Sequence, residues 1–511
     1  MKKFYAIALL GLMVLGMTAT ASAADIKATG TWNIEASMQN ADFLSTGAAS
    51  SESKTFNIEQ RIRTAFQFIA NENLKGVLDM QIGTGNWGNG LYSLGAGRAA
   101  GTVTANQAPA GSGVGASNAA GNGNIMLRKA YLDFKWPGTM TNLLVGFQTV
   151  ALPAAFGGGS AIMDDQAAAA IVVTPVTDNV KVLAGYSRLF DSNLSATTTA
   201  GALTGGGTFT DAVFAAVPID FKGVKITPFA AYAYAGKDTY ASGIGAPALP
   251  GFASGNSSVN QSMRAYWGGV AATVTALDNF KFMADFNYGK AAYSNNQTAN
   301  KGRSGWLADV AVDYTGLKMM TPSAFFVYSS GEKGNSTDGG QSGSNRMPVV
   351  GNPQSWAVGS FFFGDRNFLP GIPSSAGYVR NVMGFWTAGV SLKDIKLIDK
   401  FSHTAHLLYV QGTNDKRFIT ENGGNLNLTG AQANLANYGG FLTTKDSLWE
   451  VDFNTKYMIY DELAMNLDLG YINASFDKNV WGTSSKTNRA DYQQYGSEDA
   501  YSARLGLAYS F

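Results

Sequence analysis

Apolar and polar residues alternate along much of this chain. Between residues 26 and 38, even positions carry residues such as Ile26 and Trp32, and odd positions carry Lys27 and Glu35. A β-strand sends successive side chains to opposite faces, so this period of two predicts strands with one apolar and one polar face. The alternation recurs near residues 56–68, 280–288, 306–314, 449–457 and 463–471.

The connections between the predicted strands alternate between two lengths. Residues 71–73 and 315–316 form short turns, whereas 84–124 and 330–377 are long and rich in Gly, Ser, Asn and Thr. Short turns at one end and long loops at the other are typical of outer-membrane β-barrels. The predicted fold is therefore an all-β, antiparallel transmembrane β-barrel with short periplasmic turns and long extracellular loops.

The predicted barrel has eighteen strands. They are expected near residues 26–38, 53–70, 74–83, 125–136, 142–148, 167–173, 180–190, 209–217, 224–235, 263–275, 280–293, 304–314, 317–329, 378–392, 401–412, 448–457, 463–476 and 500–511. Sixteen strands is the alternative, because residues 167–173, 209–217 and 317–329 alternate poorly.

The two ends of the chain carry export signals. Residues 1–23 have a basic start, a short apolar stretch and the sequence Ala21-Ser22-Ala23, which predict a cleaved signal peptide. The last strand alternates up to Tyr509 and the terminal Phe511, and it looks like the sorting signal of outer-membrane barrels. We therefore expect residues 24–511 to form the barrel, in the outer membrane of a Gram-negative bacterium.

Composition excludes several other classes of protein. Without the two leader lysines, 35 basic residues stand against 36 acidic ones, so the formal charge of −1 gives no general attraction to nucleic acid. No apolar run in the exported part reaches the length of a membrane-spanning helix. The chain has no cysteine, so its stability cannot come from disulfides.

Part of the chain resembles Gram-negative general porins. The stretch Lys129–Trp136, the pair Gly138-Thr139 and the stretch Leu144–Gln148 are similar to two neighbouring strands and their turn in that family. The run Ala151–Gly159 leading to Asp164-Asp165 looks like the homotrimeric outer-membrane porins of sulfate-reducing bacteria. This resemblance implies a homotrimer and an inward-folded constriction loop near residues 149–166.

Candidate pore residues follow from the predicted closure of the sheet. The first and last strands become neighbours, which would gather a basic stripe on one wall, formed by Lys27, Arg61, Arg63, Lys75 and Arg504. Asp164 and Asp165 of the expected constriction loop would face this stripe across the pore. The alternatives are a salt bridge between the arginines and a wall carboxylate such as Glu59, and plain solvation of the two aspartates.

An enzyme is not expected. The two histidines, His403 and His406, are three residues apart on a predicted strand and therefore point to opposite faces. They cannot share an active site or a metal ion, and there is no cysteine to act as a nucleophile. We expect no cofactor and no metal.

The expected function is a porin: a water-filled channel for passive diffusion of ions and small hydrophilic solutes. Most aromatic residues fall on the outward faces, which favours general diffusion over a sugar track. The alternatives are a substrate-specific channel, for a sugar or a small organic anion, and a surface adhesin or receptor using loop 330–377. The expected partners are membrane lipids, lipopolysaccharide, the barrel-assembly machinery and the solutes.

Overall fold

The computed structural model describes residues 24–40, 55–87, 125–191, 209–236, 262–293, 302–334, 345–350, 357–361, 384–417, 442–481, 497 and 499–511. Its strands are β1 (Asp25–Asn40), β2 (Thr55–Asn71), β3 (Leu74–Asn86), β4 (Ile125–Lys135), β5 (Asn142–Ala151), β6 (Asp164–Pro175), β7 (Lys181–Asp191), β8 (Phe209–Ala216), β9 (Ile219–Phe221), β10 (Val224–Ala235), β11 (Met263–Val274), β12 (Phe280–Tyr293), β13 (Arg303–Tyr314), β14 (Thr321–Ser329), β15 (Phe385–Ile395), β16 (Phe401–Gly412), β17 (Ser447–Met458), β18 (Leu463–Ser475) and β19 (Ala500–Ser510). A short helix, α4 (Lys478–Trp481), follows β18. In the described part of the chain, no helix has the length and apolar character needed to cross a membrane.

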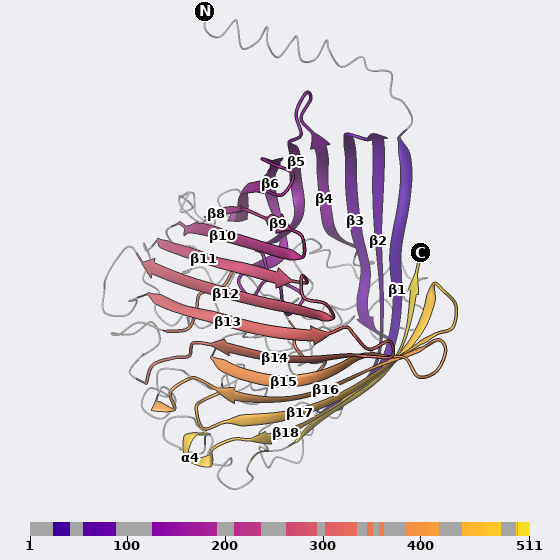
Figure 1. Cartoon of the computed structure of the whole chain (residues 1–511), viewed down its shortest axis with the longest axis vertical. Coiled ribbons are helices and arrows are strands. Elements are labelled where there is room, and N and C mark those ends of the chain that lie inside the picture. Colours follow the sequence, from indigo (N-terminus) through magenta and orange to yellow (C-terminus); the bar gives the residue numbers. More distant parts are fainter. Residues whose placement is uncertain are drawn as a thin grey trace, which may run out of the picture.

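The sheet closes on itself. Each strand pairs antiparallel with its neighbours, and β19 pairs with β1 from Thr31 opposite Ser510 to Asn40 opposite Tyr501. Figure 1 shows the indigo first strand beside the yellow end of the chain. The terminal Phe511 extends this contact, because its backbone and that of Gly30 exchange two hydrogen bonds of 2.8 and 3.1 Å. The predicted closed antiparallel barrel is confirmed.

The wall has eighteen strand positions, as predicted. Strands β8 and β9 both pair with β10, so they occupy one position in the barrel. Pro218 lies between them and has no backbone N–H to donate to the ladder, which explains the interruption. The poor alternation of residues 209–217 therefore marks an interrupted strand rather than a missing one.

Several predicted boundaries are wrong by a few residues. The strand expected at 317–329 begins at Thr321. Of the strand expected at 378–392, residues 378–383 lie outside the described residues, and the observed strand β15 begins at Phe385. The expected loop 149–166 is shorter than predicted. Its first residues continue β5 to Ala151, and its last residues already belong to β6. Short apolar and alanine-rich runs carry little period-two signal, so sequence alone does not locate these ends.

The two faces of the wall differ as the alternation predicts. On β17, Trp449, Val451 and Phe453 are exposed on the outer face, whereas Glu450 and Asp452 are buried on the inner face. Exposed outer side chains on the other strands include Phe286, Trp306, Phe326, Leu407, Leu467 and Leu505. The barrel thus has an apolar exterior and an interior that contains charged residues.

We use Gly30 to test the closure. A Cβ built at Gly30 would lie 2.5 Å from the Phe511 ring and in contact with the backbone oxygen of Arg63, whereas one at Gly76 has no neighbour closer than 3.9 Å. We expect Gly30→Ala to destabilise the barrel by about 1–3 kcal/mol, the usual cost of overpacking, while Gly76→Ala has little effect. Heat-modified mobility in gel electrophoresis measures the folded fraction, and equal folding of both variants would contradict the role of this contact.

Candidate functional site

The inner faces of five neighbouring strands form a polar wall. These strands are β19, β1, β2, β3 and β4, which are consecutive in the closed sheet. The inner side chains of this polar wall include Asn33, Glu35, Ser37, Gln39, Glu59, Arg61, Arg63, Gln67, Lys75, Asp79, Gln81, Tyr131, Asp133, Ser502 and Arg504. The residues of the predicted basic stripe all lie on this wall, on β1, β2, β3 and β19. They are spread along it, because Lys27 and Lys75 are near the turn end and Arg504 is opposite Ser37, ten residues along β1 from Lys27.

Arg504 and Arg61 lie among carboxylates rather than in a purely basic stripe. Arg504 forms an ion pair with Glu35, with 3.2 Å between Nη1 and Oε1. Glu35 lies directly opposite Glu59 on β2, and Arg61 is close enough to attract both carboxylates. All four side chains are buried. Buried like charges repel strongly, so the two arginines offset the repulsion between the glutamates. Glu59 was predicted as a partner of the arginines, whereas Glu35 was not.

Arg63 and Lys75 also have polar partners on the wall. The Arg63 Nε donates a 2.8 Å hydrogen bond to the Gln81 side chain of β3. Lys75 pairs with Asp133 on β4, with 3.2 Å between Nζ and Oδ2. These contacts hold the cationic side chains along the wall, which fixes where charge is presented.

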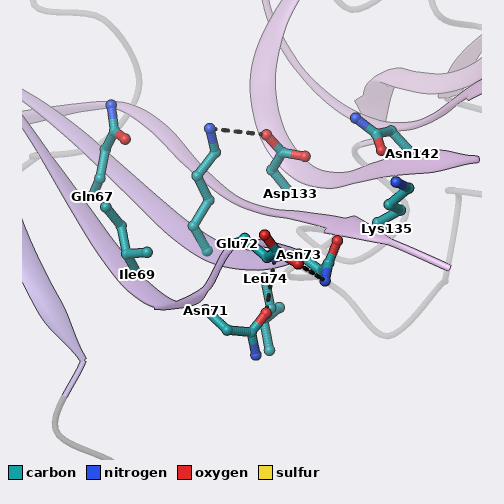
Figure 2. Close-up of a pocket in the computed structure, with 10 residues that line it drawn as sticks. Gln67, Ile69, Asn71, Glu72, Asn73, Leu74, Asp133, Lys135 and Asn142 are labelled. Carbon is teal, nitrogen blue, oxygen red and sulfur yellow. Dashed lines mark hydrogen bonds and ion pairs between the residues drawn. The ribbon is translucent and has the colours of Figure 1, made fainter. Parts of the chain in front are cut away.

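A hollow of about 540 Å³ lies at the turn end of the polar wall. Its lining includes Gln67, Lys75, Asp133, Lys135 and Asn142, so it contains charges of both signs (Figure 2). Lys27 lies on the same inner face as Gln67, which is its partner in the sheet register, and its side chain is exposed. The turn end of the polar wall is therefore exposed to solvent, whereas the part of the wall around Glu35 and Arg504 is buried.

The segment 152–163 leaves the wall between β5 and β6 and reaches β12. Asp285 of β12 accepts backbone hydrogen bonds from Ala155 and Phe156, the shortest being 2.8 Å to each nitrogen. Asp285 is buried on the opposite face of β12 from the exposed Phe286. Because β12 is not a neighbour of β5 or β6 in the sheet, this contact runs across the inside of the barrel.

Two parts of the long connection between β14 and β15 also lie inside the barrel. The Val350 N–H donates to the Ile162 carbonyl and the Ala357 N–H donates to the Gly157 carbonyl, both at 2.7 Å. Residues 345–350 and 357–361 thus pack beside segment 152–163, and we call these three stretches the inner segments. Only the first of these connections, between β5 and β6, was predicted to fold inward.

The inner segments contact wall carboxylates on another side of the barrel. Asp452 of β17 accepts a 2.8 Å hydrogen bond from the Ser360 N–H, and Glu450 accepts one of 3.0 Å from the Phe361 N–H. Both carboxylates are almost fully buried. Hydrogen bonds to an ionised acceptor are about twice as strong as neutral ones, so Asp285, Glu450 and Asp452 hold the inner segments to the wall.

Apolar packing supports these polar anchors. Ile162, Met347 and Phe361 of the inner segments are fully buried, beside wall residues of the same cluster such as Leu307 and Leu408. The Phe156 ring contacts that of Phe325 on β14, with 5.6 Å between ring centroids. The wall residues of this apolar cluster come from β5, β6 and β8, from β10 through β18, and from the start of β19. In the described part of the chain, β1 to β4 of the polar wall contribute none of them.

One further contact fixes residues 345–350. Trp267 of β11 donates a 2.7 Å hydrogen bond from its indole nitrogen to the Pro348 carbonyl. Arg346 is buried near an ion pair of Arg303 and Glu332, and burial lowers the pKa of its guanidinium to about 10, so it stays charged at neutral pH. The apolar run Met347–Val350 within a polar connection was the sequence signal for this inward path.

The predicted aspartate pair does not act as a unit. Asp164 and Asp165 are the first residues of β6 rather than part of a loop, and neighbouring strand residues point to opposite faces. Asp165 shares its face with the buried inner residues Ala167 and Ala169, whereas Asp164 shares its face with the exposed Ala168. The structure therefore leaves one of the two aspartates on the inner side.

The two histidines lie on opposite faces of β16, as expected from their spacing. His406 is on the inner face, 2.7 Å from the Ser391 hydroxyl, and lies opposite Asp452 on the next strand. Asp452 accepts a hydrogen bond from the Ser360 N–H. Among the described residues, no hydrogen bond joins Asp452 to His406, so the histidine–carboxylate contact of a Ser-His-Asp triad is not seen there. Among the described residues, no group of three or more His, Asp or Glu side chains could hold a metal ion.

No family model and no curated protein matches the sequence. Among solved structures, the outer membrane protein OprD of Pseudomonas aeruginosa is similar at 12% identity, with 96% of each chain covered and a TM-score of 0.47. OccK8 (OprE) of Pseudomonas aeruginosa has 11% identity, covers 95% of this chain and 98% of its own, and gives a TM-score of 0.48. OccAB3 of Acinetobacter baumannii has 10% identity, 95% and 99% coverage and a TM-score of 0.46. Similarity at this level carries no information on function, and the relation to porins of sulfate-reducing bacteria stays a prediction.

Removing the Asp285 anchor should loosen the inner segments. Asp285→Ala deletes the acceptor of the Ala155 and Phe156 N–H groups, and a hydrogen bond to a charged group contributes about 1.5–3 kcal/mol. We expect this variant to show larger or more frequent current steps in a planar lipid bilayer than the parent. Asp313→Asn is the control, because Asp313 pairs with Lys393 on the wall and not with an inner segment. Identical current traces for the parent and Asp285→Ala would show that this anchor does not hold the conducting path.

Proposed function

We propose that this chain is an outer-membrane channel for small hydrophilic solutes. The outer face of the barrel supports a membrane location, because exposed side chains such as Trp449, Val451 and Leu505 cover it on strand after strand. A soluble protein rarely exposes an apolar patch larger than a few hundred Å². Lipid is the environment that such a surface requires, and a closed barrel leaves no unpaired strand edge in it.

The two ends of the barrel support its orientation. Turns such as 72–73 and 222–223 join strands at one end, while the strands at the other end lead into the long connections. In outer-membrane barrels the short turns face the periplasm and the long loops face outward. The hollow at the turn end then opens on the periplasmic side.

The polar wall is the observation that supports a channel. It places polar and charged side chains inside a closed wall, and such groups favour water and dissolved ions over hydrocarbon. The wall continues to the open hollow lined by Gln67, Lys75 and Asp133. A solute that follows this wall meets fixed charges of both signs, which is how side chains control selectivity at close range.

The filled interior favours a substrate-specific channel over the general pore that the sequence analysis expected. The inner segments and their apolar cluster cover the inner face from β5 and β6 round to β18. On the polar wall, Glu35, Glu59 and Arg504 are buried, so the path is narrow at that height. A solute that crosses a narrow, charged path contacts its walls and binds to them on the way. The candidate solutes are a sugar and a small organic anion.

A homotrimer is part of this proposal. On β6 and β7, the outward residues Ala168, Ala170, Val172 and Ala184 are exposed and small, which permits the close approach of another wall. These strands also carry no outward Trp or Phe at mid-height, unlike β12 and β13. A detergent extract whose light scattering gives the mass of a single chain would contradict the trimer without affecting the channel.

A receptor or adhesin role has less support. That reading depended on loop 330–377, of which residues 345–350 and 357–361 pack inside the barrel. The remaining residues of this loop after Gly334 lie outside the described part of the chain. The contacts that can be described thus use the loop to narrow the interior.

Planar-bilayer recording tests the proposed function. We expect purified protein to give small, stepwise currents, and we expect the current to fall when the preferred solute saturates the channel. Replacing Arg61 and Arg63 with alanine removes two positive charges from the polar wall, so the ratio of cation to anion permeability should rise. The rise should be larger at low salt, because the Debye length grows from about 10 Å at 0.1 M to about 30 Å at 0.01 M.

The matched control is Lys222→Gln with Lys318→Gln, which removes two positive charges from exposed turns outside the path. An unchanged reversal potential in the double variant would show that the two arginines do not face the conducting path. No current from folded protein would defeat the channel itself. If no sugar or small organic anion reduces the current, the protein is a general diffusion pore and the substrate-specific channel is excluded.

A further inference from the structure

Three cations face outward on the strands that the structure describes, and all lie near the loop end of the barrel. They are Arg188 of β7, Arg264 of β11 and Lys290 of β12, each within three residues of the end of its strand. Their alternation places them on the outer face. Arg264 shares its face with the exposed Tyr266, and Lys290 shares its face with the exposed Tyr288.

Arg188 differs from the other two because it is neutralised. It forms ion pairs with Asp211 at 2.7 Å and with Asp191. Arg264 and Lys290 are exposed, and neither forms an ion pair or hydrogen bond with any residue in the described ranges. Two uncompensated charges on the apolar face of a membrane protein are costly unless an anion covers them.

The register brings these two cations close together. Arg264 lies opposite Ala292, and Lys290 lies opposite Tyr266, so the two cations are diagonal neighbours on adjacent strands. Such diagonal positions are about 7–8 Å apart, within reach of one another for long side chains. Lys290 lies about 10 Å from the end of its strand at a rise of 3.3 Å per residue, and its long side chain can extend part of that way toward the lipid headgroups.

Tyrosines and small residues surround the pair. Tyr232 of β10 contacts Tyr266, with 5.1 Å between ring centroids. Nearer the turn end, Ala230 lies opposite Gly268, and the position of a Cβ at Gly268 meets a single atom, at 3.9 Å. The outer wall below the two cations is therefore recessed between aromatic rings, which suits an acyl chain.

We infer that Arg264 and Lys290 bind the phosphate groups of a lipopolysaccharide molecule in the outer leaflet, with an acyl chain over Ala230 and Gly268. The inference rests on the proposed outer-membrane location and orientation. Charge complementarity carries it, because a phosphorylated lipid supplies an anion that the described residues do not. The recess beneath the cations favours a lipid over a soluble phosphate, because a soluble phosphate has no acyl chain to fill it.

Equilibrium binding of lipid A that carries both phosphates tests this site, with the full-length protein folded in detergent. A cation near an anionic lipid surface contributes about 1 kcal/mol, so the Arg264→Gln, Lys290→Gln double variant should bind about thirtyfold more weakly. Removing the phosphates from the lipid should abolish the difference between parent and variant. The control is Lys222→Gln with Lys318→Gln, which removes two exposed turn lysines at the opposite end.

Equal affinity of the parent and the double variant for phosphorylated lipid A would overturn the site. So would equally tight binding of phosphatidylglycerol by the parent, because the site would then not be specific for lipopolysaccharide. If the double variant does not fold, Arg264→Gln alone should weaken binding by about fivefold, roughly half the free-energy effect. The conductance of the parent separates the two proposals. Current without phosphate-dependent binding of lipid A would leave the channel and remove the lipid site, whereas such binding without current would leave the lipid site and remove the channel.

Discussion

The pairing of β19 with β1 is the contact on which the rest of the structure depends. In hydrocarbon, an unpaired N–H or C=O group costs several kcal/mol, so an open sheet could not stay in a membrane. The final residue takes part in the closure through the backbone contact between Phe511 and Gly30. Once the sheet is closed, alternation along each strand separates an apolar exterior from an interior that can hold charge.

Charge inside the barrel serves two purposes. On the polar wall, Arg504 and Arg61 lie among Glu35 and Glu59 and line one side of the interior. On the other side, carboxylates such as Asp285 bind backbone N–H groups and hold the inner segments in place. Carboxylates therefore line the path on one side of the interior and, on the other side, hold the inner segments that narrow it. For this reason a count of charged residues in the lumen does not reveal ion selectivity.

Sequence periodicity was enough to predict the closed barrel and most strand spans, because burial on one face imposes a period of two. The interior contacts were harder to predict. The partners of Asp285 and Glu450 lie on loops far away in the chain and are backbone groups with no sequence signature. Asp164 and Asp165 were assigned to a loop because the alanine-rich start of β6 has no alternation to mark it.

Chemical labelling of single cysteines tests most directly that the polar faces line an aqueous path and the apolar faces meet lipid. The chain has no cysteine, so one can be introduced at Gln67 on the inner face or at the adjacent Phe68 on the outer face. With a charged, membrane-impermeant thiol reagent, we expect Gln67→Cys to react quickly and its current to fall in steps, while Phe68→Cys reacts slowly and keeps its current. Equal reaction rates, or a block through Phe68→Cys, would contradict the assignment of inside and outside.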